Sequence, residues 1–170
     1  MTLTYRPMTA DDIGATIEVR LSTVENAITL AEMRDGYGVT PESIAAGLAA
    51  DAAGWVCEAA GCVVGFAMGD RATGEVTVIA LRPSHEGRGI GAALMARVED
   101  WLFAAGHDRL WLLANPDPSV RAGGFYAARG WRPAGRMRGE DVVLELARAD
   151  RWPGRAGDAV DGLDAPAPLQ

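Results

Sequence analysis

The sequence predicts a mixed α/β domain, and three observations lead to that fold class. A chain of 170 residues that is 49% hydrophobic is long enough for one core and too short for two ordinary domains. Short apolar runs bounded by turn residues, which are typical of strands, share the chain with longer segments in which apolar residues recur at helical spacing. One such helical segment lies between two predicted strands, as expected for a crossover connection. Together these patterns predict helices packed on a mixed β-sheet.

One strand, two helices and a hairpin are predicted in the first half of the chain: a strand at 2–6, a helix through 17–21, a helix from 40, and hairpin strands at 54–58 and 62–68. Thr9, with Asp12 three residues later, forms a capping box at the start of the first helix. Thr40 before Pro41 begins the second helix. The hairpin turns at residues 60–61.

Three strands and two helices are predicted in the second half: a strand at 75–81, a helix from 90 to Gly106, a strand at 109–114, a helix at 118–129 and a strand at 141–147. Leu94, Val98 and Leu102 keep helical spacing along the first of these helices. Gly106 and Gly130 end the two helices, because glycine readily adopts the left-handed conformation of a helix C-cap. The predicted order is therefore β-α-α-β-β-β-α-β-α-β.

We assign residues 1–148 to this domain and residues 149–170 to a C-terminal tail. The tail is rich in proline, glycine and aspartate and has little periodicity. Such a composition favours an extended terminus over an element of the core.

The loop after the predicted strand at 75–81 is the most informative segment of the chain. Gly87, Gly89 and Gly91 alternate there, where a helix begins. Glycine allows the backbone to approach a ligand closely, and the helix adds the positive end of its dipole, so this loop can cradle a pyrophosphate. A dinucleotide-binding loop is excluded because Leu94 stands where its third glycine would be. A Walker loop is excluded because the chain contains no lysine.

Residues 86–91, Glu-Gly-Arg-Gly-Ile-Gly, resemble the acyl-CoA pyrophosphate loop of the GNAT superfamily of N-acetyltransferases, Gln/Arg-x-x-Gly-x-Gly/Ala. Both glycines of that pattern are present, whereas Glu86 replaces the usual Gln or Arg. Residues 121–131 resemble the family's helix that ends in Phe-Tyr and is followed by a glycine and an aromatic residue. The resemblance covers residues 2–147, and residues 75–131 carry its specific part.

The resemblance implies the GNAT acyltransferase fold and acetyl-CoA as the cosubstrate. The strands at 75–81 and 109–114 are expected to splay apart, with a bulge near residues 79–81, so that the pantetheine arm lies beside the first strand. Ser119 stands where many relatives carry an asparagine that contacts the cofactor. The residues implied in cofactor binding are Ile79, Ala80, Leu81, Glu86, Gly87, Arg88, Gly89, Ile90, Gly91, Ala92 and Ser119.

Tyr126 matches the tyrosine that in this family protonates or hydrogen-bonds the departing sulfur. The alternative is a core tyrosine whose hydroxyl is hydrogen-bonded within the protein. The neighbouring Phe125 is interpreted as packing. For Gly123 and Gly124, close approach to the cofactor and a general excess of glycine stay equally open.

Glu75 lies eleven residues before Glu86, the spacing at which some GNAT enzymes place a general base. The alternative is a turn carboxylate after Gly74. Strand alternation predicts that the odd-numbered residues of the strand at 75–81 share one face, with Glu75 directed towards the site.

Several other polar side chains are assigned no catalytic role. Asn115 is interpreted as a cap of the turn that follows it, His85 lies beside the glycine loop, and His107 follows the end of a helix. Cys57 and Cys62 flank the hairpin without a metal or redox motif, so we expect reduced cysteines and no metal site.

Acceptor specificity in this family comes from the first two helices and their connection, which corresponds to residues 24–37 here. A solvated helix face is the alternative for each polar residue of this segment. The side chains suited to an ammonium group are Glu25, Asn26, Glu32, Asp35 and Tyr37.

The formal net charge of −7 argues against binding to the phosphates of a nucleic acid and favours a cationic partner such as an amine. The sequence has no apolar run of membrane-spanning length and no signal-like N-terminus, so we expect a cytoplasmic protein without a membrane partner. Family habit, together with aromatic residues expected at the surface (Trp131 and Trp152), suggests a homodimer.

These features predict an N-acetyltransferase that moves the acetyl group of acetyl-CoA directly to a primary amine of a small molecule or peptide. The alternative is a CoA-binding module of the same fold that regulates a partner without transfer. Thiol release from acetyl-CoA in the presence of amines distinguishes the two.

Overall fold

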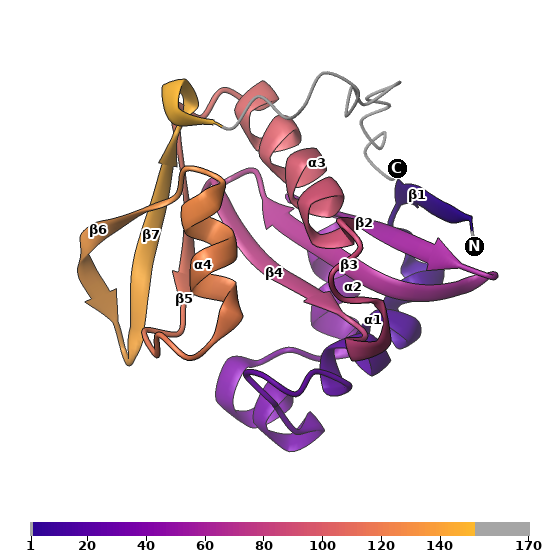
Figure 1. The fold of residues 1–170 in the computed structure, drawn as a ribbon. Helices are drawn as coiled ribbons and strands as arrows, with labels where there is room; N and C mark the ends of the chain where they lie inside the picture. Colours follow the sequence, from indigo (N-terminus) through magenta and orange to yellow (C-terminus); the bar gives the residue numbers. More distant parts are fainter. Residues whose placement is uncertain (1, 152–170) are drawn as a thin grey trace.

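A mixed β-sheet carries the fold (Figure 1), and the computed structural model describes residues 2–151. The strands of this part of the chain are β1 (Leu3–Pro7), β2 (Ala52–Ala59), β3 (Cys62–Asp70), β4 (Glu75–Leu81), β5 (Arg109–Ala114), β6 (Arg132–Arg138) and β7 (Asp141–Ala147). The helices are α1 (Ile13–Leu21), α2 (Pro41–Leu48), α3 (Ile90–Ala104) and α4 (Arg121–Ala128). Short helical turns are η1 (Ala10–Asp12), η2 (Glu32–Gly36), η3 (Pro83–His85) and η4 (Arg148–Asp150).

The sheet consists of two antiparallel parts that meet at one parallel pair of strands. The strand order is β1-β2-β3-β4-β5-β7-β6, and β4 runs parallel to β5. In the described chain these two strands are paired at one position, Glu75 with Trp111, and diverge beyond it. The expected splay between these two strands is therefore confirmed.

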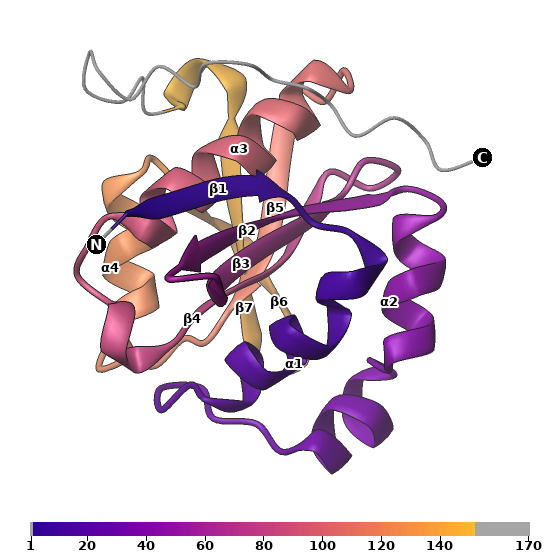
Figure 2. The same cartoon turned by 90° about the vertical axis from the view of Figure 1, so that its right-hand side faces the viewer.

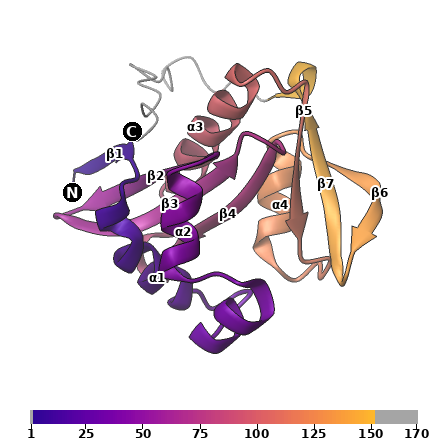
Figure 3. The ribbon, with the colours of Figure 1, turned by 180° about the vertical axis from the view of Figure 1, so that it is seen from behind.

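Helices cover both faces of the sheet (Figure 2). On one face α3 and α4 pack on a buried cluster that includes Leu94, Val98 and Leu144. On the other face α1 and α2 pack on a second cluster around Val56 and Phe66. Seen from that side, the segment between α1 and α2 extends beyond them towards the lower ends of β5 and α4 (Figure 3). This arrangement confirms the predicted mixed α/β architecture.

Local signals position the elements largely as predicted. The backbone N–H of Thr9 donates to Asp12 Oδ2 at 2.8 Å, which closes the expected capping box. The N–H of Ser43 donates to Thr40 Oγ1 at 3.1 Å at the start of α2. The predicted strands at 75–81, 109–114 and 141–147 match β4, β5 and β7.

Two predictions of secondary structure were wrong. The sequence analysis missed β6, an edge strand paired only with β7 among the described strands, whose register shifts between Pro133 and Met137. Its residues are mostly exposed and show no apolar alternation, so they lack the usual strand signal. The last helix begins at Arg121 instead of 118, because Asp117 Oδ1 accepts hydrogen bonds from the N–H and Oγ of Ser119 and holds a turn there.

The bulge in β4 lies at Thr77, which corrects the expected position near residues 79–81. Val78 pairs with Met68 and Val76 pairs with Gly69, so Thr77 has no partner in β3. An extra residue reverses the alternation of the side chains that precede it. The predicted shared face of the odd-numbered residues in β4 is therefore wrong.

Because of the bulge, the odd-numbered side chains of β4 lie on two different faces of the sheet. Ile79 and Leu81 pack against the core beneath α3. Glu75, Thr77 and Val78 line a pocket on the side of α1 and α2. Glu75 thus faces a pocket, as expected, but without Ile79 and Leu81.

A buried ion pair anchors the end of α4 to α3. Glu99 is fully buried and accepts hydrogen bonds from Arg129 Nη2 at 2.8 Å and Trp131 Nε1 at 3.1 Å. The N–H of Trp131 donates to the carbonyl of Tyr126 at 3.1 Å. Trp131 is 1% exposed, which corrects the expectation of a surface aromatic there. Trp152 and most of the predicted tail lie outside the described residues.

Across residues 2–151 the helices are too short or too polar to cross a lipid bilayer. The same part of the chain contains no group of three His, Cys, Asp or Glu side chains arranged to hold a metal ion. Cys57 is buried and Cys62 is exposed, and both thiols are free.

Candidate functional site

The splay between β4 and β5 separates two regions with different chemistry. The glycine loop and the start of α3 lie at the carboxyl end of β4. An open pocket of about 1410 Å³ lies on the sheet face that α1 and α2 cover.

The glycine loop forms an open cradle of backbone donors. Gly87 and Gly89 adopt left-handed φ values of 73° and 77°, and an added Cβ at either position would meet nothing within 4 Å. Among residues 2–151, no acceptor is found for the backbone N–H groups of residues 87–92. They lie at the positive end of α3, a helix of 15 residues. The cradle therefore fits the pyrophosphate of an acyl-CoA.

The edge of β4 beside the splay is free to bind an extended ligand. Ile79, Ala80 and Leu81 pair with β3 on one edge, and within the described residues none of them pairs with β5 on the other. A Cβ added at Gly91 would lie 3.6 Å from both Leu81 Cδ1 and the Phe125 ring. The end of β4, the start of α3 and the Phe125 ring of α4 thus meet at this point, where a pantetheine arm could run along β4.

Tyr126 lies on α4 and is only 8% exposed. Its ring packs against Phe125 and Trp131, with centroids 5.5 and 6.3 Å apart. Within residues 2–151 its hydroxyl makes no hydrogen bond to another residue, and its catalytic role stays a prediction. Burial raises the pKa of Tyr126 to about 12, so the phenol keeps its proton at neutral pH and can act as a donor.

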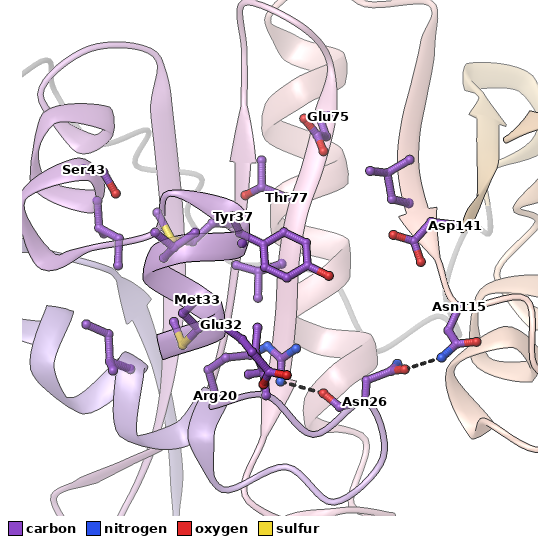
Figure 4. Close-up of a pocket in the computed structure, with 18 of the residues that line it drawn as sticks. Arg20, Asn26, Glu32, Met33, Tyr37, Ser43, Glu75, Thr77, Asn115 and Asp141 are labelled. Atoms are coloured by element: carbon purple, nitrogen blue, oxygen red, sulfur yellow. Dashed lines mark hydrogen bonds between the residues drawn. The ribbon is translucent and has the colours of Figure 1, made fainter. Parts of the chain in front are cut away.

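The pocket is lined by both apolar and polar side chains (Figure 4). Its apolar lining comes from both helices and from the sheet and includes Ile17, Ile44, Phe66, Met68 and Val78. Its labelled polar side chains include Arg20, Asn26, Glu32, Tyr37, Glu75, Thr77, Asn115 and Asp141. Such a mixture is typical of sites for organic molecules that carry a few charged groups.

Glu75 is half-buried in this pocket, at the point where β4 meets β5. Burial raises the pKa of Glu75, Arg138 opposes that shift, and Asp70 adds to it. In the described part of the chain its carboxylate forms no salt bridge. A carboxylate with a raised pKa and a free face towards a pocket can accept a proton from a ligand.

The predicted acceptor segment divides into residues that line the pocket and residues that do not. Asn26, Glu32 and Tyr37 line it, although Glu32 also accepts a hydrogen bond from the Thr29 N–H at 2.7 Å. Asp35 instead pairs with Arg34 at 2.7 Å and is not part of the lining. The fifth residue, Glu25, faces the start of α4.

An ion-pair network links Glu25 to the glycine loop. Glu25 accepts a hydrogen bond from the N–H of Arg121 at 3.0 Å and pairs with its guanidinium. The same guanidinium contacts Glu86 at the start of the loop. Asn26 Oδ1 accepts a 2.7 Å hydrogen bond from Asn115 Nδ2, so the α1–α2 segment is attached twice to the region that follows β5.

Three further predicted residues have local roles. Asn115 Oδ1 accepts a hydrogen bond from the Asp117 N–H at 2.9 Å, which confirms its interpretation as a cap. His85 Nδ1 lies 2.8 Å from Ser84 Oγ, and His107 Nε2 lies 2.5 Å from the carbonyl of Arg71. Neither histidine lines the pocket. An added Cβ at Gly123 or Gly124 would meet nothing within 4 Å, so both readings of these glycines stay open.

Arg20 and the β6–β7 turn also line the pocket, although no sequence pattern pointed to them. Arg20 lies in the last turn of α1, where a basic residue is common for helix stability alone. Arg138, Glu140 and Asp141 enter the pocket through a strand pairing that the sequence pattern did not reveal. Only the tertiary structure brings these residues next to Glu75.

Comparison with known proteins gives one consistent result. The model of the acetyltransferase (GNAT) family matches residues 27–131, more than half of the chain. A curated mycothiol acetyltransferase from Beutenbergia cavernae is 41% identical over 64 residues, which is 38% of this chain and 21% of that protein. The chain thus matches only a small part of that relative.

Solved structures with the same fold cover most of the chain. A PaiA N-acetyltransferase from Thermoplasma acidophilum in complex with coenzyme A superposes with a TM-score of 0.74 and 18% identity, over 86% of this chain and 99% of that one. The ribosomal-protein-S18-alanine N-acetyltransferase from Escherichia coli gives 0.67 and 18%, over 91% and 98%. At this identity the likeness demonstrates a common fold.

Proposed function

Because the chain belongs to the acetyltransferase (GNAT) family, we propose that it transfers the acetyl group of acetyl-CoA directly to a primary amine of a small molecule or peptide. The observation that carries the proposal is the splay between β4 and β5, with an anion cradle at one side and the Glu75 pocket at the other. This arrangement allows an acyl donor and an acceptor to approach each other from opposite sides.

Glu75 and Tyr126 are proposed as the proton-transferring residues. When bound, acetyl-CoA supplies an activated acetyl group whose departure releases a thiolate. Glu75 accepts the proton that the acceptor ammonium must lose, directly or through water, and its raised pKa makes it a stronger base than an exposed carboxylate. Tyr126 holds a proton on its hydroxyl and offers it to the sulfur, because its pKa of about 12 keeps it neutral.

The backbone is proposed to hold and orient the cosubstrate. The N–H groups of residues 87–92 bind the pyrophosphate, and the free edge of β4 at residues 79–81 orients the pantetheine arm. Ser119 is the weakest member of the proposed set, because its hydroxyl donates to Asp117 at 2.8 Å. Ser119 Oγ can therefore donate to the cosubstrate only if that hydrogen bond breaks, whereas its lone pairs can still accept one.

The test is thiol release from acetyl-CoA across a panel of amines, amino acids, peptides and aminoglycosides. We expect amine-dependent thiol release, together with thermal stabilisation of the protein by acetyl-CoA. Stabilisation without thiol release for any amine would instead support a CoA-binding module that regulates a partner. The mycothiol acetyltransferase relative supports acetyl transfer in the proposal without specifying this chain's acceptor.

The homodimer and the cytoplasmic location stay predictions. Trp131 no longer supports an interface, because its side chain is buried in the core. Light scattering at micromolar protein tests the dimer, and a monomer mass would contradict it. Fractionation of cells that express the natural gene tests the location.

A further inference from the structure

Arg20 is a pocket residue that the proposed chemistry does not use. It belongs to the last turn of α1, and its guanidinium points into the pocket beneath the ring of Tyr37 (Figure 4). Glu75 and Asp141 lie at other parts of the same lining. The pocket therefore presents a cation and carboxylates to one ligand.

One edge of the Arg20 guanidinium is fixed and the other is unused. Nη1 donates to Thr23 Oγ1 at 2.8 Å and to the carbonyl of Asn26 at 3.0 Å, and these contacts fix its orientation. In residues 2–151, Nε and Nη2 donate to no acceptor, and no carboxylate pairs with Arg20. These two nitrogens form the edge of a guanidinium that binds a carboxylate through two parallel hydrogen bonds.

The environment of Arg20 makes an unpaired charge costly. The side chain is half-buried, and this burial lowers the pKa of Arg20, with Tyr37 opposing the shift. A desolvated cation with unused donors is stabilised when an anion binds to it. The second arginine of the pocket differs, because Arg138 stacks over the Trp111 ring at 4.8 Å.

We propose that the acceptor amine also carries a carboxylate, which binds the free edge of Arg20 while the amino group lies towards Glu75. Amino acids and short peptides with a free C-terminus form this class. The inference rests on the proposed acetyl transfer and narrows its acceptor. A purely cationic polyamine would place positive charge against Arg20 and is disfavoured. The apolar walls, including Ile17, Ile44 and Phe66, favour an apolar side chain on the acceptor.

The experiment compares each amino acid with its carboxamide in the thiol-release assay. Amidation removes the negative charge of the carboxylate and retains the amino group. Because amidation also changes the pKa of the amine, the rates are corrected for the fraction of free amine. We expect kcat/KM to be about tenfold or more higher for the acids, as a charge-assisted bidentate contact provides. Arg20→Gln should abolish this preference, and Arg20→Lys should restore part of it. Arg71→Gln, a control at an exposed arginine outside the pocket lining, should leave the preference unchanged.

The acid-to-amide ratio separates recognition from a merely structural role. If Arg20 only holds the α1–α2 segment, Arg20→Gln will lower both rates equally, and that result would overturn the inference. Equal or better use of the amides by the unmutated protein would overturn it as well.

A binding measurement keeps the test decisive if no amine is acetylated. In that case the proposed function fails, and calorimetry measures binding of N-acetylated amino acids and their amides to the CoA-loaded protein. A preference for the acids that Arg20→Gln removes would support the site at Arg20. Binding without such a preference, or no binding, would refute it.

Discussion

The cradle before α3 and the pocket beside Glu75 differ in how the chain builds them. The cradle consists of consecutive residues, 86–92, and uses mainly backbone groups. The pocket combines side chains from α1, α2, β3, β4, β5 and the β6–β7 turn. A backbone site survives most substitutions of side chains, whereas a site of distant side chains can change its ligand through single substitutions.

The largest expected effect concerns the cradle. Gly89→Glu should abolish stabilisation by acetyl-CoA, because it adds a bulky anion where the pyrophosphate binds and because φ is 77° there. In the unmutated protein this stabilisation should be about 2.7 kcal/mol at a hundredfold excess over Kd. The measurement is a thermal-shift titration.

Gly61→Glu is a matched control for backbone strain. Gly61 also has a left-handed φ of 78°, but it lies in the β2–β3 turn. This variant should retain the response to acetyl-CoA. An absent response in the unmutated protein would refute the cradle.

The next effect concerns Tyr126. Tyr126→Phe should lower turnover by about 10²-fold while acetyl-CoA affinity stays nearly unchanged, since the lost hydroxyl acts mainly as the sulfur departs. Tyr5→Phe is the control, because the pKa of Tyr5 is also raised to about 12 by burial, but this tyrosine lies in β1. Steady-state kinetics measures both variants. Unchanged turnover in Tyr126→Phe would return Tyr126 to a packing role.

A smaller effect with a distinct pH dependence is expected for Glu75→Gln. The rate should fall most near neutral pH and recover as the pH rises, because free amine then becomes abundant without a base. The pH profile of turnover checks this. A loss that is constant across pH would identify Glu75 as a structural turn residue.

The same substitution also tests the environment of Glu75 without any substrate. Because the pKa of this carboxylate is raised in the folded state, ionisation at neutral pH opposes folding. This penalty is absent below the unfolded pKa, where the carboxyl is neutral in both states. It is complete once the pH has risen through the folded pKa. Glu75→Gln should therefore raise Tm at pH 7 and have little effect near pH 3. A lower Tm at pH 7 would contradict a desolvated Glu75.

The smallest expected effect concerns Glu86, which lies at the start of the glycine loop. Glu86→Gln removes a carboxylate beside the cradle and one of the two acidic partners of Arg121, so acetyl-CoA affinity should rise a few-fold at low salt. Glu25→Gln is the control for the change in ion pairing, because it removes the other acidic partner of Arg121 without changing the loop. A loss of affinity in Glu86→Gln would mean that the Glu86 side chain itself contacts the cosubstrate.

Sequence patterns predicted the features that local residues determine. Glycines at 87 and 89, the apolar spacing of α3 and the Thr40 cap each depend on neighbours in the chain, and the structure confirms them. The bulge at Thr77 could not be predicted in this way, because it depends on the register against β3. Arg20 was missed for a similar reason. Its unused edge becomes evident only after the loop at 23–26 has folded around it.

The single paired position between β4 and β5 has a mechanical consequence. Within residues 2–151 the strands of each part pair antiparallel, with local register shifts, and Glu75 with Trp111 is the one paired position between the two parts. A pantetheine arm lying in this seam would supply backbone-like hydrogen bonds that the chain itself does not make there. The cosubstrate would then act as a missing strand as well as a reactant. Amide hydrogen exchange in β4 and β5 should accordingly slow when CoA fills the seam.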